Sequence, residues 1–249
     1  MKVISWNIAC LPRYLNLFSD PMNRIASILK KLSKYDADII CLQEVFDKNV
    51  REIIIKYFKD KKNTIEYSYY YSNPTNIFFN DGLLTISKYK IINKQSFIFE
   101  NTCGEDCMVC KGYHYLILHD IENNKYVSLL NTHLNADPNI RLKDHPVTTR
   151  ENQLRKILKT INNNSFSYNL FCGDLNVKYE NPNRLLLLDS IKGHYKNVYT
   201  NLEKIKTFEV DQLDYIIYYG SKELIKYELK NELIVNESDH HLLFCFIQH

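Results

Sequence analysis

The stretch from Phe171 to Val177 joins an apolar run to two side chains that can bind a cation or orient water. The run Tyr168–Cys172 predicts a buried strand, after which Gly173 leads to Asp174 and Asn176. In extended backbone, residues i and i+2 point to the same side, so both polar side chains would project together from the strand end. Active sites of α/β proteins often lie at such strand ends. The alternative is an Asx turn, in which Asp174 and Asn176 bond only nearby backbone.

Other predicted strands also end in polar or ionisable residues: Asn7, Glu44, His133, and Asp239 with His240. A further carboxylate, Asp214, lies inside the apolar run Leu213–Ile216, where an unpaired charge is costly to bury. It needs a partner, and a histidine is a natural one. Each residue alone has an ordinary structural explanation, such as a cap, a surface acid, a core histidine or a turn. We do not expect all of them to reach strand ends by chance.

These donors are mainly carboxylates and amides, the oxygen ligands that hard divalent cations prefer. The set therefore favours Mg²⁺, with Mn²⁺ as the alternative, over zinc. Cys103, Cys107 and Cys110 form a separate Cys-x3-Cys-x2-Cys cluster, with His114 as the nearest fourth zinc ligand. A zinc site or a disulfide is open there, but ordinary loop cysteines are the favoured interpretation.

Composition sets broad limits. The chain has 249 residues, of which 45% are hydrophobic, and a formal net charge of +3, so it neither demands nor excludes nucleic acid as a partner. No apolar run is long enough for a transmembrane helix, and the first residues read as a strand rather than a signal peptide. Together with seven cysteines, this predicts a soluble, intracellular monomer with reduced thiols. With no linker or repeat, we expect a single catalytic domain over residues 1–249.

Hydrophobic periodicity predicts alternating strands and helices at the start of the chain and mostly strands after it. Strands are expected over 2–9, 38–42, 83–87, 113–121, 126–132, 168–172, 212–218, 224–229 and 241–247. Helices are expected over 21–34, with Ser19 or Asp20 as the cap, and over 47–59, 149–162 and 183–191. The opening strand–helix–strand–helix order indicates a layered α/β fold.

Six ordered motifs resemble those of the endonuclease/exonuclease/phosphatase superfamily, which includes DNase-like nucleases, abasic-site endonucleases, inositol-polyphosphate 5-phosphatases and neutral sphingomyelinases. They are Trp6-Asn7, Leu42-Gln43-Glu44, Asn131-Thr132-His133-Leu134, Gly173-Asp174-Leu175-Asn176, Leu213-Asp214-Tyr215 and Ser238-Asp239-His240. The resemblance implies a four-layer α/β sandwich of two mixed sheets flanked by helices. It also implies metal-dependent attack of water on a phosphoester.

The resemblance further implies a role for each matching residue. Metal ligands would be Glu44, Asn7 and Asp239. Catalytic residues would be His240 as the base, Asp214 orienting it, Asp174 positioning the water, Asn176 on a phosphate oxygen and His133 as a donor on the leaving-group side. Substrate contacts would come from Asn176, His133 and Asn135.

Within the superfamily, the closest similarity is to neutral sphingomyelinases. It is carried by Leu11-Pro12-Arg13, Gln43–Asp47, Gly82–Tyr89, Cys103–Asp106 with Lys111–Tyr113, Thr132–Asp137, Arg150 and Gln153-Leu154. This implies a phospholipid phosphodiesterase, with a DNase-like or abasic-site endonuclease as the alternative and a degenerate binding protein as the third hypothesis. Secreted sphingomyelinases carry a signal peptide and an apolar membrane-touching hairpin, and we find neither clearly in this sequence. The aromatic runs Tyr67–Tyr71 and Ile77–Phe79 could make a peripheral membrane contact or stack on bases, but core strand is favoured.

Overall fold

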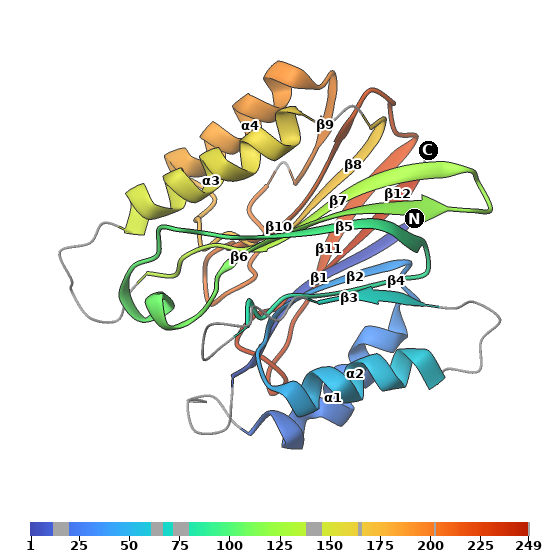
Figure 1. The fold of residues 1–249 in the computed structure, drawn as a ribbon, viewed down its shortest axis with the longest axis vertical. Helices are drawn as coiled ribbons and strands as arrows, with labels where there is room; N and C mark the ends of the chain where they lie inside the picture. The colour runs from blue at the N-terminus through green and yellow to red at the C-terminus, as the bar shows by residue number, and fades with distance from the viewer. Residues whose placement is uncertain are drawn as a thin grey trace.

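Two β-sheets lie face to face, and a pair of helices covers the outer face of each (Figure 1). The structure is a computed structural model that describes residues 1–11, 20–60, 67–71, 80–137, 146–163, 166–201 and 203–248. The predicted four-layer α/β sandwich is therefore confirmed. That residues 1–249 form a single domain stays a prediction.

The first sheet has strand order β11-β12-β1-β2-β4-β3. Its strands are β1 (Lys2–Cys10), β2 (Ile39–Val45), β3 (Ser68–Tyr70), β4 (Leu84–Ser87), β11 (Lys226–Glu232) and β12 (Leu242–Gln248). Strands β1 and β2 are parallel, while β1 and β12 are antiparallel, so the sheet is mixed. Helices α1 (Pro21–Lys34) and α2 (Lys48–Asp60) cover its outer face. Asp20 caps α1 by accepting a hydrogen bond from the Met22 N–H, and the other cap candidate, Ser19, lies outside the described residues.

The second sheet has strand order β5-β6-β7-β8-β10-β9. Its strands are β5 (Lys90–Ile98), β6 (Gly112–Asp120), β7 (Lys125–His133), β8 (Tyr168–Asp174), β9 (Asn197–Tyr199) and β10 (Asp214–Gly220). Helices α3 (Pro146–Asn162) and α4 (Pro182–His194) cover its outer face. A 3₁₀ helix, η2 (Gly104–Met108), lies between β5 and β6.

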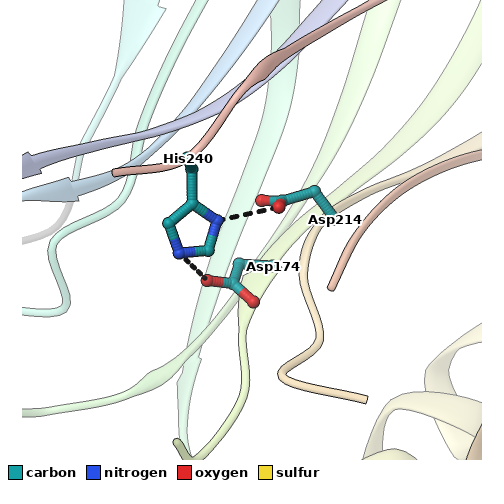
Figure 2. Close-up of side chains that lie close together, drawn as sticks. All are labelled: Asp174, Asp214 and His240. Carbon is teal, nitrogen blue, oxygen red and sulfur yellow. Dashed lines mark hydrogen bonds and ion pairs between the residues drawn. The ribbon is translucent and has the colours of Figure 1, made fainter. Parts of the chain in front are cut away.

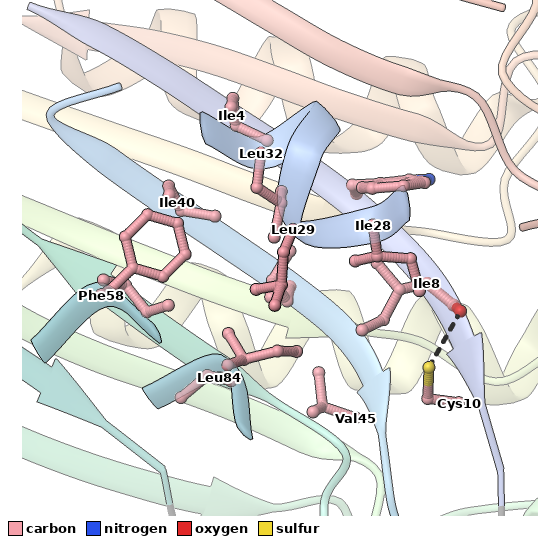
Figure 3. Close-up of a cluster of buried hydrophobic side chains, with 14 of the residues drawn as sticks. Ile4, Ile8, Cys10, Ile28, Leu29, Leu32, Ile40, Val45, Phe58 and Leu84 are labelled. Atoms are coloured by element: carbon pink, nitrogen blue, oxygen red, sulfur yellow. Dashed lines mark hydrogen bonds between the residues drawn. The ribbon is translucent and has the colours of Figure 1, made fainter. Parts of the chain in front are cut away.

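Three apolar clusters hold these layers together. One lies between α1, α2 and the first sheet, where Ile28 and Leu32 of α1 pack towards Ile8 and Ile40 (Figure 3). A second lies between the second sheet and its helices, and a third fills the space between the sheets. Because all three are extensive, the strand ends that carry polar residues rest on a rigid base.

Burial agrees with the interpretation of the cysteines. Cys10, Cys41, Cys172 and Cys245 are buried core residues, as predicted. Cys103, Cys107 and Cys110 are free thiols, and within the described part of the chain they do not gather into a metal-binding group. This agrees with ordinary loop cysteines.

Periodicity missed the two edge strands of the second sheet. Strands β5 and β9 were not predicted, and most of β5 is exposed at the edge of its sheet, so it lacks an apolar face. The run Tyr67–Tyr71 forms the short edge strand β3, with Tyr67 buried and Tyr69 and Tyr71 exposed. The run Ile77–Phe79 lies outside the described residues.

Candidate active site

Residues from both sheets meet at one end of the sandwich. On the second sheet, strand register places Asp174 of β8 beside His133 of β7 and beside Asp214 of β10. On the first sheet, Asn7 of β1 lies next to Gln43 of β2, and Glu44 is the residue that follows Gln43. His240 reaches the same place from the segment before β12, since its side chain contacts Asp214. Adjacent strands thus bring together residues that are far apart in the sequence.

The end of β8 differs from the extended backbone that the sequence suggested. Strand β8 stops at Asp174, and Asn176 adopts a left-handed conformation with φ of 49°. The Asn176 N–H donates to Asp174 Oδ1 at 2.9 Å, which is the Asx turn considered as the alternative. Just before it, Gly173 is required because a Cβ there would lie 2.1 Å from the carbonyl oxygen of Thr132. The turn still directs the Asn176 amide towards His133.

His240 and Asp214 form a buried pair, and Asp174 faces the opposite nitrogen of the imidazole (Figure 2). His240 Nδ1 lies 2.8 Å from Asp214 Oδ2, and His240 Nε2 lies 3.7 Å from Asp174 Oδ2. The other oxygen of Asp214 is buried and has no hydrogen-bond partner among the described residues. The negative charge of Asp214 therefore acts mainly on the imidazole, which supplies the histidine partner predicted for this buried acid.

The Asn7 side chain links the two sheets at the site. Its Nδ2 donates to Glu44 Oε1 at 3.0 Å and to Asp174 Oδ2 at 3.1 Å, while its Oδ1 accepts from the Ala9 N–H. The amide thus presents nitrogen, not oxygen, to the two carboxylates. A metal-ligand role for Asn7 through Oδ1 would require the amide to turn over, and it stays a prediction.

Backbone strain gathers at this end of the molecule. Ala9, Glu44 and Asn176 all have positive φ, at 47°, 56° and 49°, in a region that residues with a Cβ seldom occupy. Each such residue costs on the order of 1–2 kcal/mol. Strain of this kind is typical of functional sites, where surrounding contacts hold residues in unfavourable conformations.

His133 sits in a more crowded place than the sequence suggested. Lys111 Nζ lies 3.0 Å and Asn176 Nδ2 lies 3.1 Å from His133 Nε2, and both of these groups are donors. The Nε2 atom must therefore accept, and the neutral ring carries its proton on Nδ1. In this arrangement Nε2 has no proton to give to a leaving group. Lys111 itself is 3% exposed and forms an ion pair with Asp106 at 2.9 Å.

The pKa values of the two histidines are shifted in opposite directions. Burial, with the charges of Lys111 and His240, holds the pKa of His133 well below its usual value. Burial also opposes the charged form of His240, but Asp214 and Asp174 outweigh it and raise its pKa to about 10. The two rings therefore differ in charge at neutral pH, one neutral and one protonated.

The carboxylates of the site repel one another, and the pKa values of two of them are raised. Burial and the neighbouring charge of Asp214 raise the pKa of Asp174 to about 7, against opposing contributions from His240, Asn7 and Asn176. Burial and the charge of Asp239 raise the pKa of Glu44 above its usual value. Raised carboxylate pKa values mean that negative charge is crowded here, and a bound cation would relieve it.

Not every predicted residue reaches the open part of the site. Glu44 and Asn176 are partly exposed and Asp239 is exposed, so these three face solvent. Asn135 is fully buried: its Oδ1 accepts from the Cys103 N–H and its Nδ2 donates to Ala136 O. It braces the segment around Cys103 rather than lining the site.

A metal-binding group is available at this position. Asp174, Asp214 and His240 each offer one ligand atom, and these atoms lie within 4.8 Å of one another. His240 and Asp214 already bond each other, while Glu44 and Asp239 belong to no such group among the described residues, so their role as metal ligands stays a prediction. All of these oxygen donors fit a hard divalent cation.

Two residues of the site were not identified as such from the sequence. Lys111 was quoted only as part of a resembling segment, and nothing in its sequence context distinguishes a buried lysine from an exposed one. Phe208 packs against the His240 ring, with centroids 4.7 Å apart, and precedes no recognisable motif.

Known proteins resemble this chain along most of its length. The profile of the Endonuclease/Exonuclease/phosphatase family matches residues 4–240. A sphingomyelinase C of Bacillus cereus is 30% identical over 158 residues, which is 56% of this chain and 46% of that protein. A sphingomyelinase C of Listeria ivanovii is 26% identical over 196 residues, which is 72% of this chain and 56% of that protein. The alignments thus span about half the length of these relatives.

Solved structures show the same fold. The crystal structure of SmcL superposes with a TM-score of 0.81 at 20% identity, covering 99% of this chain and 98% of that one. A mutant of Staphylococcus aureus beta toxin with bound magnesium ions gives a TM-score of 0.79 at 20% identity, covering 98% of each chain. A truncated Caenorhabditis elegans TDP2 gives 0.68 at 20% identity, covering 100% of this chain and 97% of that one.

Proposed function

Because the chain belongs to the endonuclease/exonuclease/phosphatase family, we propose that this polar cluster is the active site of a Mg²⁺-dependent sphingomyelinase-like phosphodiesterase. The observation that carries the proposal is the buried His240–Asp214 pair at 2.8 Å, facing Asp174 across the imidazole. The preference for a phospholipid rests on the sphingomyelinase C relatives. The products would be ceramide and phosphocholine.

The metal would be held by Glu44 and Asp239, with Asn7 beside them. Crowded carboxylates and oxygen donors suit Mg²⁺ better than a soft ion, and Mn²⁺ is the alternative. When bound, such a cation neutralises the charge on the phosphoryl oxygens and so stabilises the transition state. The magnesium ions bound to the structurally similar beta toxin agree with this choice.

The nucleophile would be activated by His240. Without a metal ion, His240 is protonated at neutral pH. A bound dication beside it would lower its pKa, and the neutral ring, with Nδ1–H donated to Asp214, would then present the lone pair of Nε2 towards Asp174. A water held by Asp174 could lose its proton to Nε2 as its oxygen attacks phosphorus. A base of this kind contributes about 10²–10⁴-fold to the rate. Asp214 fixes the tautomer and stabilises the imidazolium that forms.

The leaving group lies on the opposite side of the phosphorus from the attacking water. As the P–O bond to ceramide breaks, negative charge develops on the departing oxygen. Lys111 Nζ and Asn176 Nδ2 both contact His133 Nε2, but Lys111 also donates to the Leu134 carbonyl and pairs with Asp106, and Asn176 also donates to the Leu134 carbonyl. Lys111 would therefore act through its positive charge, and the partly exposed Asn176 amide would exchange one of its present acceptors for a phosphate oxygen. To leave as ceramide, the departing oxygen must take up a proton; in this proposal solvent water supplies it, and His133 positions Lys111 and Asn176.

One assay tests the proposal against its alternative. Purified protein with Mg²⁺ is given sphingomyelin micelles, plasmid DNA, an abasic duplex and inositol phosphates in parallel. We expect phosphocholine release that stops with a chelator and falls at least 100-fold in His240→Ala. Cleavage of DNA or the abasic duplex instead would establish the nuclease alternative, and full turnover by His240→Ala would remove the proposed base.

The phospholipid proposal leaves cellular location open. Among the described residues, no helix is both long and apolar enough to cross a membrane. An intracellular location, a peripheral membrane contact and a monomeric state all stay predictions. Each requires measurement of the protein itself.

A further inference from the structure

Strands β1 and β12 separate just where they reach the site. Their antiparallel pairing runs from Lys2 opposite Phe246 to Ser5 opposite Leu243 and then stops. Strand β1 nevertheless continues to Cys10, and Ser238–His240 immediately precedes β12. Where a ladder ends inside a protein, the freed backbone carbonyls must find other donors.

Arg24 of α1 supplies those donors. Its side chain is 5% exposed. One terminal nitrogen donates to the Ile8 carbonyl at 3.1 Å and to the Glu237 carbonyl, and the other donates to the Ala9 carbonyl at 2.7 Å. A single planar guanidinium thus joins the strand just after Asn7 to the segment just before Asp239 and His240.

Other hydrogen bonds reinforce this junction from within. Ser238 Oγ donates to the Asn7 carbonyl at 2.7 Å and accepts from the His240 N–H at 3.1 Å. The Trp6 indole donates to the His240 carbonyl at 3.0 Å. Helix α1 lies directly on this part of β1, with Ile28 packing towards Ile8 (Figure 3), so Arg24 is anchored on a rigid element.

The separation of the strands is what gives the site its shape. In a continued ladder Asn7 would lie opposite His241, and His240 opposite Ile8. Instead, Asn7 reaches Glu44 and Asp174 while His240 reaches Asp214 on the other sheet. The positive φ of Ala9, whose carbonyl Arg24 binds, marks the strain that this separation requires.

We infer that Arg24 is a positioning residue for the reaction, fixing the segment that carries Asp239 and His240 relative to Asn7. The inference rests on the proposed function for its kinetic consequence. It needs arginine specifically, because a forked guanidinium can bind three carbonyls from two segments, whereas a lysine ammonium is a point charge. A purely structural role would affect stability alone, without a selective loss of turnover.

Arg24→Lys keeps the charge and removes the fork. Arg51→Lys is the matched control, since Arg51 is equally buried on the neighbouring helix α2 and lies over the Tyr71 ring. In folded protein with sphingomyelin and Mg²⁺, we expect kcat of Arg24→Lys to fall about 10–100-fold, as small misplacements of reacting groups do. The KM for substrate should stay within about threefold, and Arg51→Lys should keep the wild-type kcat.

A second readout does not depend on turnover. The hydrogen-bonded Nδ1–H of His240 should give a downfield proton resonance in wild-type protein and in Arg51→Lys, and it should shift or broaden in Arg24→Lys. An Arg24→Lys protein with wild-type kcat and an unchanged resonance would overturn the inference. If wild-type protein turns over no phosphodiester, the proposed function fails, and the resonance alone decides the role of Arg24.

A second pair of variants covers the case in which Arg24→Lys does not fold. Ser238→Ala removes the hydroxyl that bonds both the Asn7 carbonyl and the His240 N–H, while Ser27→Ala removes only a hydroxyl that bonds the Glu237 side chain. We expect kcat to fall at least fivefold in Ser238→Ala and to stay near wild type in Ser27→Ala. Equal kcat values in the two variants would contradict the inference.

Discussion

Replacing Asp214 by asparagine removes the charge that acts most strongly in favour of protonated His240 while keeping the shape of the side chain. Asp214 is fully buried and bonds Nδ1 of the imidazole at 2.8 Å. We expect Asp214→Asn to lower the pKa of His240 and to reduce catalysis sharply. The two effects have the same origin, because the carboxylate both stabilises the imidazolium and fixes the tautomer.

The size of the effect follows from the pKa of His240, which the site raises from 6.5 to about 10. At 1.36 kcal/mol per unit, this corresponds to on the order of 5 kcal/mol of net preference for the charged ring. A neighbouring opposite charge accounts for about 1–3 units in such sites, so Asp214→Asn should lower the pKa of His240 by about that much. Loss of the oriented base should reduce kcat/KM by about 10²–10⁴-fold.

The direction in which the free energy of unfolding changes with pH follows from the same pKa shift. A folded-state pKa above the unfolded value stabilises the protein fully below pH 6.5, and this contribution is lost as pH rises towards 10. Asp174, with its pKa raised from 3.8 to about 7, adds a loss of stability as pH rises across that interval. Asp214→Asn should therefore flatten the fall in the free energy of unfolding above pH 6.5.

The assay combines NMR titration of histidine-labelled, metal-free protein with urea unfolding at several pH values and steady-state kinetics with Mg²⁺. Asp120→Asn is the matched control, since Asp120 is a buried acid at the end of β6 that bonds Asn123. A His240 pKa that is unchanged in Asp214→Asn, or a kcat/KM within threefold of wild type, would refute the reasoning.

Three further predictions concern other parts of the site. Glu44→Gln should reduce kcat/KM at least 100-fold at low Mg²⁺ and weaken the activating effect of Mg²⁺. Glu52→Gln, on the exposed face of α2, should change neither quantity. Equal Mg²⁺ titration curves for wild-type protein and Glu44→Gln would exclude Glu44 as a ligand. Lys111→Met should raise the pKa of His133, because the ammonium charge beside the ring is lost, and NMR titration showing no rise would contradict the assigned contact. Gly173→Ala should lower the free energy of unfolding by about 3 kcal/mol, because its Cβ would meet the Thr132 carbonyl, and a loss below about 0.5 kcal/mol in urea unfolding would contradict that clash.

The sequence predicted most of the architecture because apolar periodicity is strong where elements are buried. The predicted helix over 21–34 matches α1, and the buried strands β2 and β8 were recognised with small errors at their ends. The edge strand β5 escaped because most of its residues face water and leave no apolar face, whereas the edge strand β11 was predicted over 224–229. The existence of β5 depends on pairing with a neighbour, which is a tertiary property.

The sequence likewise predicted only part of the site. The cost of burying Asp214 indicated a histidine partner, and His240 is that partner. The sequence left the Asx turn at Asn176 open as the alternative. It did not indicate that Lys111 is buried beside His133, because that depends on how loops close over the strand ends. Arg24 likewise occupied an ordinary position on an amphipathic helix until the strands it joins were seen to separate.

We propose above all that this cluster hydrolyses a phospholipid phosphodiester with the help of a divalent cation. The most direct measurement is phosphocholine release from sphingomyelin micelles by wild-type protein, Glu44→Gln and His240→Ala, with Mg²⁺ and with a chelator. We expect phosphocholine release that requires Mg²⁺ and falls at least 100-fold in both variants at low Mg²⁺. Release that persists with the chelator or in His240→Ala, or no release from wild-type protein, would contradict it.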